Sequence, residues 1–222
     1  QVGSDIDGEA AYDQSGWSVS MSSDGTRVAI GAPMNAAGQV RVYEESSGTW
    51  TQVGADIDGE ALYDFSGAAV SMSSDGTRVA IGAEYNGSAA GHVRVFYDNS
   101  GTWTQVGSDI DGEAANVNNY SGQSVSMSSD GTRVAIGASG NDGTGTDAGH
   151  VRVYAESGGT WTQVGQDIDG EAAGDQFGRS VSLSSDGTRV AIGAPYNDDN
   201  GSSSGHVRVY DWNSGTSQWT QV

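Results

Sequence analysis

The sequence contains no cysteine, which excludes a disulfide framework and any thiolate metal site. It also contains no lysine, so its nine basic residues are all arginine, against 29 aspartate and glutamate residues. The net charge of −20 would repel a phosphate backbone, and we expect no nucleic-acid partner. No apolar run reaches the length of a membrane span, and no signal peptide opens the chain. We therefore expect no membrane insertion.

The residues that are abundant are small and polar. The 222 residues include 35 glycines, and only 35% of the chain is apolar. This composition suits many short strands joined by tight turns. The negative charge favours solubility in salt and attraction for divalent cations, so it fits an extracellular or cell-surface location.

Internal repetition is the strongest signal in the chain. The segment QVGxDIDGEA begins at Gln1, Gln52, Gln105 and Gln163, and SSDGTRVAIGA follows in every copy. The repeats are 1–51, 52–104, 105–162 and 163–220, and residues 221–222 begin the pattern again. We interpret 1–222 as a single propeller or as a segment of a longer array. A closed four-blade ring and an eight-blade ring made of two chains are the alternatives.

Hydrophobic alternation divides each repeat into four strands. In the first repeat these are residues 18–22, 26–32, 39–43 and 49–53. Asp24 and Gly25 predict a tight turn that makes the first two strands a hairpin. Four short antiparallel strands in each repeat predict an all-β fold, a β-propeller whose blades each have four strands. The small residues of the first two strands suit the crowded inner part of a blade, and Tyr43 and Trp50 suit its outer part.

The repeats resemble the FG-GAP family, which builds the propeller of integrin alpha chains and of many surface proteins. The fullest match is Phe177-Gly178, then Gly193-Ala194-Pro195 and the segment 205–210. The FG position is looser in the other three repeats, and the GAP position is looser in the second and third. The resemblance implies a propeller with a binding or structural role. Many family members carry an aspartate-rich calcium loop between the first two strands. This chain has only Ser-Ser-Asp-Gly-Thr there, so that calcium site is not carried over.

A different acidic motif, D-I-D-G-E, lies in the connections between blades. Alternating carboxylates followed by glycine can wrap a hard cation, and calcium is the candidate cofactor. The alternative is that these acids cap turns and pair with the repeated arginines. Asp13, Asp64 and Asp175 are candidates for further oxygen ligands, with Asn116 near the corresponding place in the third repeat. The candidate metal ligands are Asp5, Asp7, Glu9, Asp56, Asp58, Glu60, Asp109, Asp111, Glu113, Asp167, Asp169 and Glu171.

Other residues recur at fixed positions, and for each a structural role is the simplest interpretation. Eight arginines recur and are expected to pair with acids between strands or blades. His92, His150 and His206 share one position, for which we expect a surface or hydrogen-bonding role. The tryptophan of each fourth strand is expected to pack. Trp17 and Trp212 break the repeat and are the better candidates for exposed aromatic contacts.

No asymmetric catalytic constellation is visible, since every candidate catalytic residue is repeated three or four times. We therefore expect a non-enzymatic extracellular structural or adhesive protein, which self-associates or contacts protein or glycan partners. The alternative is a lectin-like or calcium-assisted binding propeller. Its specificity would reside in the loops where the repeats differ most, which are 33–37, 84–90, 139–148 and 195–204. An enzyme would need a catalytic domain elsewhere or an asymmetric pocket.

Overall fold

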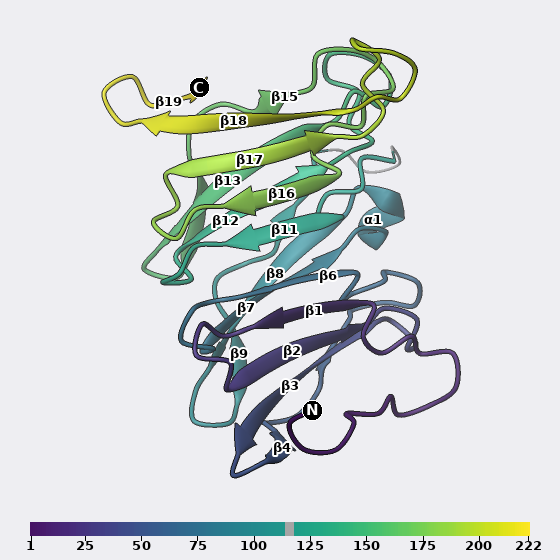
Figure 1. Ribbon diagram of the computed structural model, residues 1–222, viewed down its shortest axis with the longest axis vertical. Helices are drawn as coiled ribbons and strands as arrows, with labels where there is room; N and C mark the ends of the chain where they lie inside the picture. The colour runs from purple at the N-terminus through teal and green to yellow at the C-terminus, as the bar shows by residue number, and fades with distance from the viewer. Residues whose placement is uncertain (114–117) are drawn as a thin grey trace.

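The chain forms four antiparallel β-sheets that follow one another in sequence order. The structure, a computed structural model, describes residues 1–113 and 118–222. Figure 1 shows the sheets succeeding each other along the long axis, from the purple N-terminal blade to the yellow C-terminal one. The innermost strands β1, β6, β11 and β16 lie next to one another in that order. This is the predicted all-β propeller architecture, with one sheet for each repeat.

Each blade contains the four strands that the alternation predicts, within one to three residues at each end. The first blade consists of β1 (Ser18–Met21), β2 (Arg27–Ala32), β3 (Gln39–Ser46) and β4 (Thr49–Gln52). The second consists of β6 (Ala69–Met72), β7 (Arg78–Ala83), β8 (His92–Asp98) and β9 (Trp103–Gln105). The third consists of β11 (Ser124–Met127), β12 (Arg133–Ala138), β13 (His150–Ser157) and β14 (Thr160–Gln163). The fourth consists of β16 (Ser180–Leu183), β17 (Arg189–Ala194), β18 (His206–Asn213) and β19 (Gln218–Gln221).

The first three sheets carry a fifth strand that the sequence pattern does not reveal. It is the Ile-Asp pair of the D-I-D-G-E motif, and it pairs antiparallel with the start of the third strand of the preceding blade. Ile57 lies opposite Val40 and is almost fully buried, which explains why two residues suffice to make the pairing. The acidic connection is therefore partly built into the sheet before it. These short strands are β5 (Ile57–Asp58), β10 (Ile110–Asp111) and β15 (Ile168–Asp169).

The hairpin turn between the first two strands is held by its aspartate. The Oδ1 atom of Asp24 accepts hydrogen bonds from the Thr26 amide at 3.0 Å and from the Ser22 hydroxyl at 2.7 Å. Gly25 has a φ of 74°, a left-handed conformation that glycine adopts without a steric penalty. The same bonds recur in the other blades, so this invariant segment is a structural turn.

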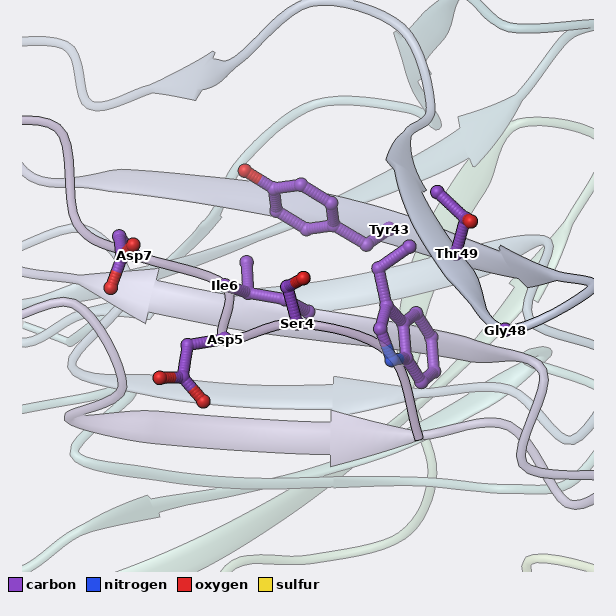
Figure 2. A pocket seen from close by; sticks show the side chains of 8 residues that line it. Ser4, Asp5, Ile6, Asp7, Tyr43, Gly48 and Thr49 are labelled. Atoms are coloured by element: carbon purple, nitrogen blue, oxygen red, sulfur yellow. The ribbon is translucent and has the colours of Figure 1, made fainter. Parts of the chain in front are cut away.

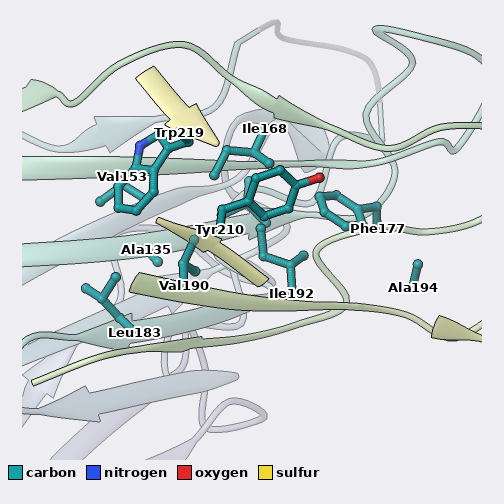
Figure 3. Packing of buried hydrophobic residues seen from close by; sticks show 11 residues of the cluster. Ala135, Val153, Ile168, Phe177, Leu183, Val190, Ile192, Ala194, Tyr210 and Trp219 are labelled. Carbon is teal, nitrogen blue, oxygen red and sulfur yellow. The ribbon is translucent and has the colours of Figure 1, made fainter. Parts of the chain in front are cut away.

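Neighbouring blades join through apolar clusters. Figure 3 shows the one between the third and fourth blades, where Val153 of β13 faces Leu183, Val190 and Ile192. Each such buried aliphatic side chain contributes about 1.5–3 kcal/mol relative to an exposed one. Ile168, which belongs to the connection between the blades, lies in the same cluster. A blade therefore buries its apolar faces only when it has neighbours.

Polar contacts fix how closely the innermost strands approach. The amide of Met72 donates to the hydroxyl of Ser20 at 2.9 Å, and the Ser71–Met127 and Ser126–Leu183 pairs repeat this bond. The serines on one side of the strand thus satisfy backbone groups of the next blade. The structure also describes one short helix, α1 (Asn86–Ala89), and no helix among the described residues is long and apolar enough to cross a membrane.

Candidate functional site

The carboxylates of the D-I-D-G-E motif are divided between two places. The middle aspartate lies in the short fifth strand, where Asp111 is opposite His92 and Asp169 is opposite His150. The first aspartate and the glutamate of one motif approach different histidines. Among the described residues, the three acids of one motif are not gathered at one point.

Each cluster is instead assembled around the histidine that begins a third strand. In the second blade, Nδ1 of His92 lies 4.0 Å from Oε2 of Glu60 and 3.8 Å from Oδ2 of Asp109. Glu60 comes from the connection entering the blade, and Asp109 comes from the connection leaving it. We call this group, with its equivalents, the junction cluster. The clusters of the second and third blades are Glu60–His92–Asp109 and Glu113–His150–Asp167. In the fourth blade Glu171 and His206 are joined by Asp199, which comes from the loop between β17 and β18 and not from a motif.

The first blade has a glutamine in place of the histidine, and its contacts differ. Gln39 donates through Nε2 to Oε2 of Glu9 at 3.2 Å and accepts from Asn35 at 3.0 Å. The side-chain amide of Gln39 therefore has a hydrogen-bond partner for its nitrogen and one for its oxygen. In the second and third blades Nδ1 of His92 and Nδ1 of His150 lie 3.8–4.0 Å from the acids, which is too far for such a hydrogen bond.

Burial and the nearby charges determine the protonation of the third cluster. Burial and the guanidinium of Arg152 lower the pKa of His150 to about 4, so the ring is neutral at neutral pH. Arg152 donates to both oxygens of Asp167, at 2.9 and 2.8 Å, and holds the pKa of that carboxyl below its usual value. Burial also lowers the pKa of His92. A neutral imidazole can donate its lone pair to a ligand.

The comparison with known families concerns the fourth repeat. The family model described as "FG-GAP repeat" matches residues 167–210, which include the Phe177-Gly178 and Gly193-Ala194-Pro195 segments. The chain carries an FG-GAP repeat. This confirms the resemblance inferred from the motifs. No curated protein matches the sequence.

Solved structures with a similar fold are distant in sequence. One is Kuenenia stuttgartiensis hydrazine synthase (TM-score 0.59, 15% identity), which aligns over 99% of this chain and 53% of its own. Another is a provisionally assigned 6-phosphogluconolactonase from Bacteroides uniformis (TM-score 0.62, 16% identity), with 92% and 52% covered. A third is TolB from Acinetobacter baumannii (TM-score 0.52, 16% identity), with 89% and 41% covered. The chain spans about half the length of the first two and less of TolB, and these likenesses describe the fold alone.

The recurrent arginines of the blades pair with acids as expected. Arg94 lies 3.8 Å from Glu60 of the junction cluster, and its Nη2 donates to the backbone oxygen of Asp58 at 2.7 Å. The arginines that follow the hairpin turn use other acids: Arg27 contacts Glu44 and Asp98, both at 2.9 Å. These pairs agree with the interpretation that the motif acids stabilise the fold. Cation binding by the motif stays a prediction.

The additional oxygen ligands proposed for the motif lie elsewhere. Asp64 is buried and accepts from the Ala61 amide at 2.9 Å and from Asn86 at 3.0 Å, and Asp175 bonds Asn197 at 2.9 Å. These aspartates therefore close loops of their own. Asn116 lies outside the described residues.

Two predictions about side-chain exposure are wrong. His92 and His150 are buried because the fifth strand and the next blade cover the start of the third strand, so a surface role does not apply to them. Trp212 is half-buried because it packs on Trp219, with ring centroids 5.4 Å apart. Trp17, in contrast, is largely exposed, as predicted.

The tryptophans of the fourth strands pack, as expected. Each indole donates to the backbone oxygen of a valine at the start of the preceding connection, for example Trp103 to Val53 and Trp161 to Val106, both at 2.8 Å. Sugar stacking on this row is therefore restricted. The indoles anchor each blade to the connection that leads into it.

The variable loops contain an asymmetric pocket that the repeat pattern does not reveal. A pocket of about 190 Å³ between the first two blades is lined by Trp17, Met34, Phe65 and Tyr85 together with Glu84. Glu84 stands where two other repeats have proline, and burial raises the pKa of its carboxyl. Its Oε2 atom has no hydrogen-bond partner in the part of the chain that the structure describes. The sequence signal that could have indicated this pocket is the glutamate at position 84, which departs from the repeat pattern.

Proposed function

We propose that the chain is a non-enzymatic, extracellular or cell-surface structural or adhesive repeat module, and that copies of it join end to end. The observation that supports this proposal is the complementarity of the uncovered faces of the first and last blades. These two faces correspond to the two sides of the internal blade junctions. A second copy of the chain can therefore use contacts that the molecule already makes three times.

The uncovered face of the first blade is apolar. Val19 and Met21 of β1 are 63% and 53% exposed, whereas the equivalent Val70 and Met72 of the second blade are 9% and 7% exposed. The preceding blade accounts for this difference, because Val70 and Met72 pack against residues of the first blade. Exposed apolar faces of this kind favour association.

The uncovered face of the last blade presents the opposite half of the junction. Val207 of β18 is 68% exposed, whereas the equivalent Val151 is fully buried beside Ile168 of the fifth strand. Among the described residues, β18 has no such fifth strand. In the other three sheets an Ile-Asp pair lies against the equivalent edge, so an Ile-Asp pair of a second copy fits here.

An unpaired Ile-Asp pair exists at the start of the chain. Ile6 and Asp7 have the sequence of the fifth strands but form no strand, and they line a pocket of about 350 Å³ with Tyr43 and Trp50 (Figure 2). By the register of the third blade, Ile6 of one copy would lie opposite Val207 of another. The order is the same as in the internal junctions, so association propagates in one direction.

Composition and charge support the other parts of the proposal. The net charge of −20 suits a salt-rich surrounding, where screening permits acidic copies to associate. The recurring arginines and serines make contacts within and between blades, as described above, which favours a structural role over catalysis.

Sedimentation velocity over a concentration series in physiological salt tests end-to-end association. We expect association that increases with concentration, and we expect Val207→Asp to abolish it because the interface would bury an unpaired charge. Leu62→Asp is the matched control, since Leu62 is 66% exposed but lies in the connection between the first two blades. A chain that stays monomeric, or association that Val207→Asp leaves unchanged, contradicts the proposal.

Ligand binding at the variable loops is the second candidate, and the pocket at Glu84 supports it. Exposed Trp17 and Tyr85 offer ring faces for stacking, and the free oxygen of Glu84 offers a hydrogen-bond partner for hydroxyl groups. These features suit a glycan. Screening against a glycan array tests this candidate: binding that Trp17→Ala and Glu84→Gln abolish would support it, and the absence of any bound glycan would contradict it.

A further inference from the structure

The junction cluster leaves a buried nitrogen without a partner. The side chain of His150 is 5% exposed, and its Nδ1 atom has no hydrogen-bond partner in the described part of the chain. That atom lies 3.9 Å from Oδ2 of Asp167 and 4.0 Å from Oε2 of Glu113, which is too far for a hydrogen bond. A buried polar atom without a hydrogen-bond partner destabilises the folded state. In the second blade Nδ1 of His92 faces Glu60 and Asp109 at similar distances, while the buried atom without a partner among the described residues is its Nε2.

We propose that the junction clusters bind divalent transition-metal ions, with one histidine nitrogen and two carboxylates as protein ligands. The cluster of the second blade, Glu60, His92 and Asp109, is the leading site. This proposal concerns ligand chemistry that the D-I-D-G-E motif alone does not contain. It differs from the calcium prediction in the metal and in the histidine ligand, and it joins carboxylates of two successive motifs at one site.

The spacing of the ligand atoms suits a small ion. Zinc–nitrogen and zinc–oxygen bonds of about 2.1 Å place two tetrahedral ligand atoms about 3.4 Å apart. The His92 nitrogen lies 3.8 and 4.0 Å from its two carboxylate oxygens, so they need to move inward by about half an ångström to meet the ion. Glu60 and Asp109 are partly exposed and can make this movement, while the buried histidine stays fixed.

The donor set selects the class of metal. Imidazole nitrogen is a preferred ligand of zinc and other first-row transition metals, whereas calcium takes oxygen ligands in larger number. Two carboxylates and one neutral imidazole supply three ligands and leave a position for water.

The arginines beside the clusters predict which cluster binds a metal ion more tightly. In the second blade, Arg94 approaches Glu60 only at 3.8 Å, and Oδ1 of Asp109 is held by Gln105 at 2.7 Å, which leaves Oδ2 facing the histidine. In the third blade, Arg152 donates to both Glu113 and Asp167 and competes with a cation. We therefore expect the second-blade cluster to bind a metal ion more tightly than the third-blade cluster.

A bound ion would connect parts of the chain that are far apart in sequence. Glu60 precedes the second blade, His92 begins its third strand and Asp109 follows its fourth strand. The ion would therefore tie the incoming connection to the outgoing one. Binding to the folded state alone raises thermal stability with metal concentration.

Isothermal titration calorimetry of the whole chain with zinc tests the proposal, with circular dichroism as a check of folding. We expect saturable binding of up to three ions, which excess calcium does not displace. His92→Gln should remove one ion, and the triple change of His92, His150 and His206 to glutamine should abolish binding. Glutamine is the matched substitution because Gln39 occupies this position in the first blade.

The converse change makes the test independent of any loss of folding. Gln39→His should add one zinc ion, since Glu9 and Asp56 occupy the positions of Glu60 and Asp109 in the first blade. The cobalt-loaded protein should show the absorption of a low-coordinate cobalt site, reduced in the His92→Gln variant. Zinc binding that survives the triple change, or that calcium displaces, would overturn the proposal, because surface carboxylates alone would then explain it.

Discussion

Arg27 of the first blade extends to Asp98 of the second, with Nη1 2.9 Å from Oδ2 and both side chains largely buried. The same guanidinium donates to the Gly76 carbonyl of the second blade and pairs with Glu44 of its own blade. Arg78 repeats the contact to Glu156 of the third blade at 3.3 Å. One arginine therefore joins two blades by charge, at the end of the sheet opposite to the junction cluster.

The first prediction concerns how closely neighbouring blades approach. A Cβ atom on Gly82 would collide with the backbone oxygen of Gly122 in the next blade, and no flexible side chain can yield there. We expect Gly82→Ala to lower the free energy of unfolding by about 2–4 kcal/mol through displacement of the blades. Urea denaturation measures the change.

Gly101→Ala is the control for Gly82→Ala. Gly101 has a φ of 86° and open space around it, so alanine there adds backbone strain without a collision. We expect that variant to lose about 1 kcal/mol. Equal losses in the two variants would contradict the role assigned to the close approach.

The second prediction concerns the hairpin turns in acid. Hydrogen bonds from the Thr26 amide and the Ser22 hydroxyl lower the pKa of Asp24 to about 2, and equivalent bonds lower the pKa of Asp186 to about 2. Because the folded pKa lies below the unfolded value, the unfolded state takes up protons first. The turns therefore contribute full stability above about pH 4 and lose it between about pH 4 and pH 2.

Thermal unfolding at a series of pH values measures this acid dependence. Asp24→Asn keeps an acceptor oxygen but removes the titrating group, so its stability should fall less steeply in that range than that of the parent chain. Asp13→Asn is the comparison, since Asp13 is outside the turns. A steepness unchanged by Asp24→Asn would contradict the prediction.

The sequence predicts the strands well because each repeat shows its alternation beside strong turn signals. The sequence does not predict the pairing of Val40 with Ile57. A two-residue strand is too short to show an alternation, and it forms only against a neighbouring sheet. The junction cluster escaped prediction for a related reason. Asp109 and Glu113 begin and end one D-I-D-G-E motif, yet they approach different histidines, because the fifth strand passes between two blades. Contacts between repeats are set by packing and not by local spacing.

The last prediction returns to the arginine that joins blades. Arg189 of the last blade is equivalent to Arg27, and its side chain is 59% exposed because no blade follows it among the described residues. Glu45 of the first blade occupies the position of Asp98. If copies join end to end, Arg189 of one copy meets Glu45 of the next, as Arg27 meets Asp98 within the chain. The pair would be partly buried, so the affinity between copies would depend on the two residues having opposite charges.

Charge exchange tests this contact without changing apolar area. Arg189→Glu should weaken association about tenfold or more, since it places two acids together, and Glu45→Arg alone should do the same. The double variant restores an opposite-charge pair and should recover most of the affinity, measured by sedimentation velocity at a single salt concentration. Recovery in the double variant identifies Arg189 and Glu45 as direct partners. Additive losses would show that the two residues do not meet, and the orientation of the joined copies would have to differ from that of the internal blades.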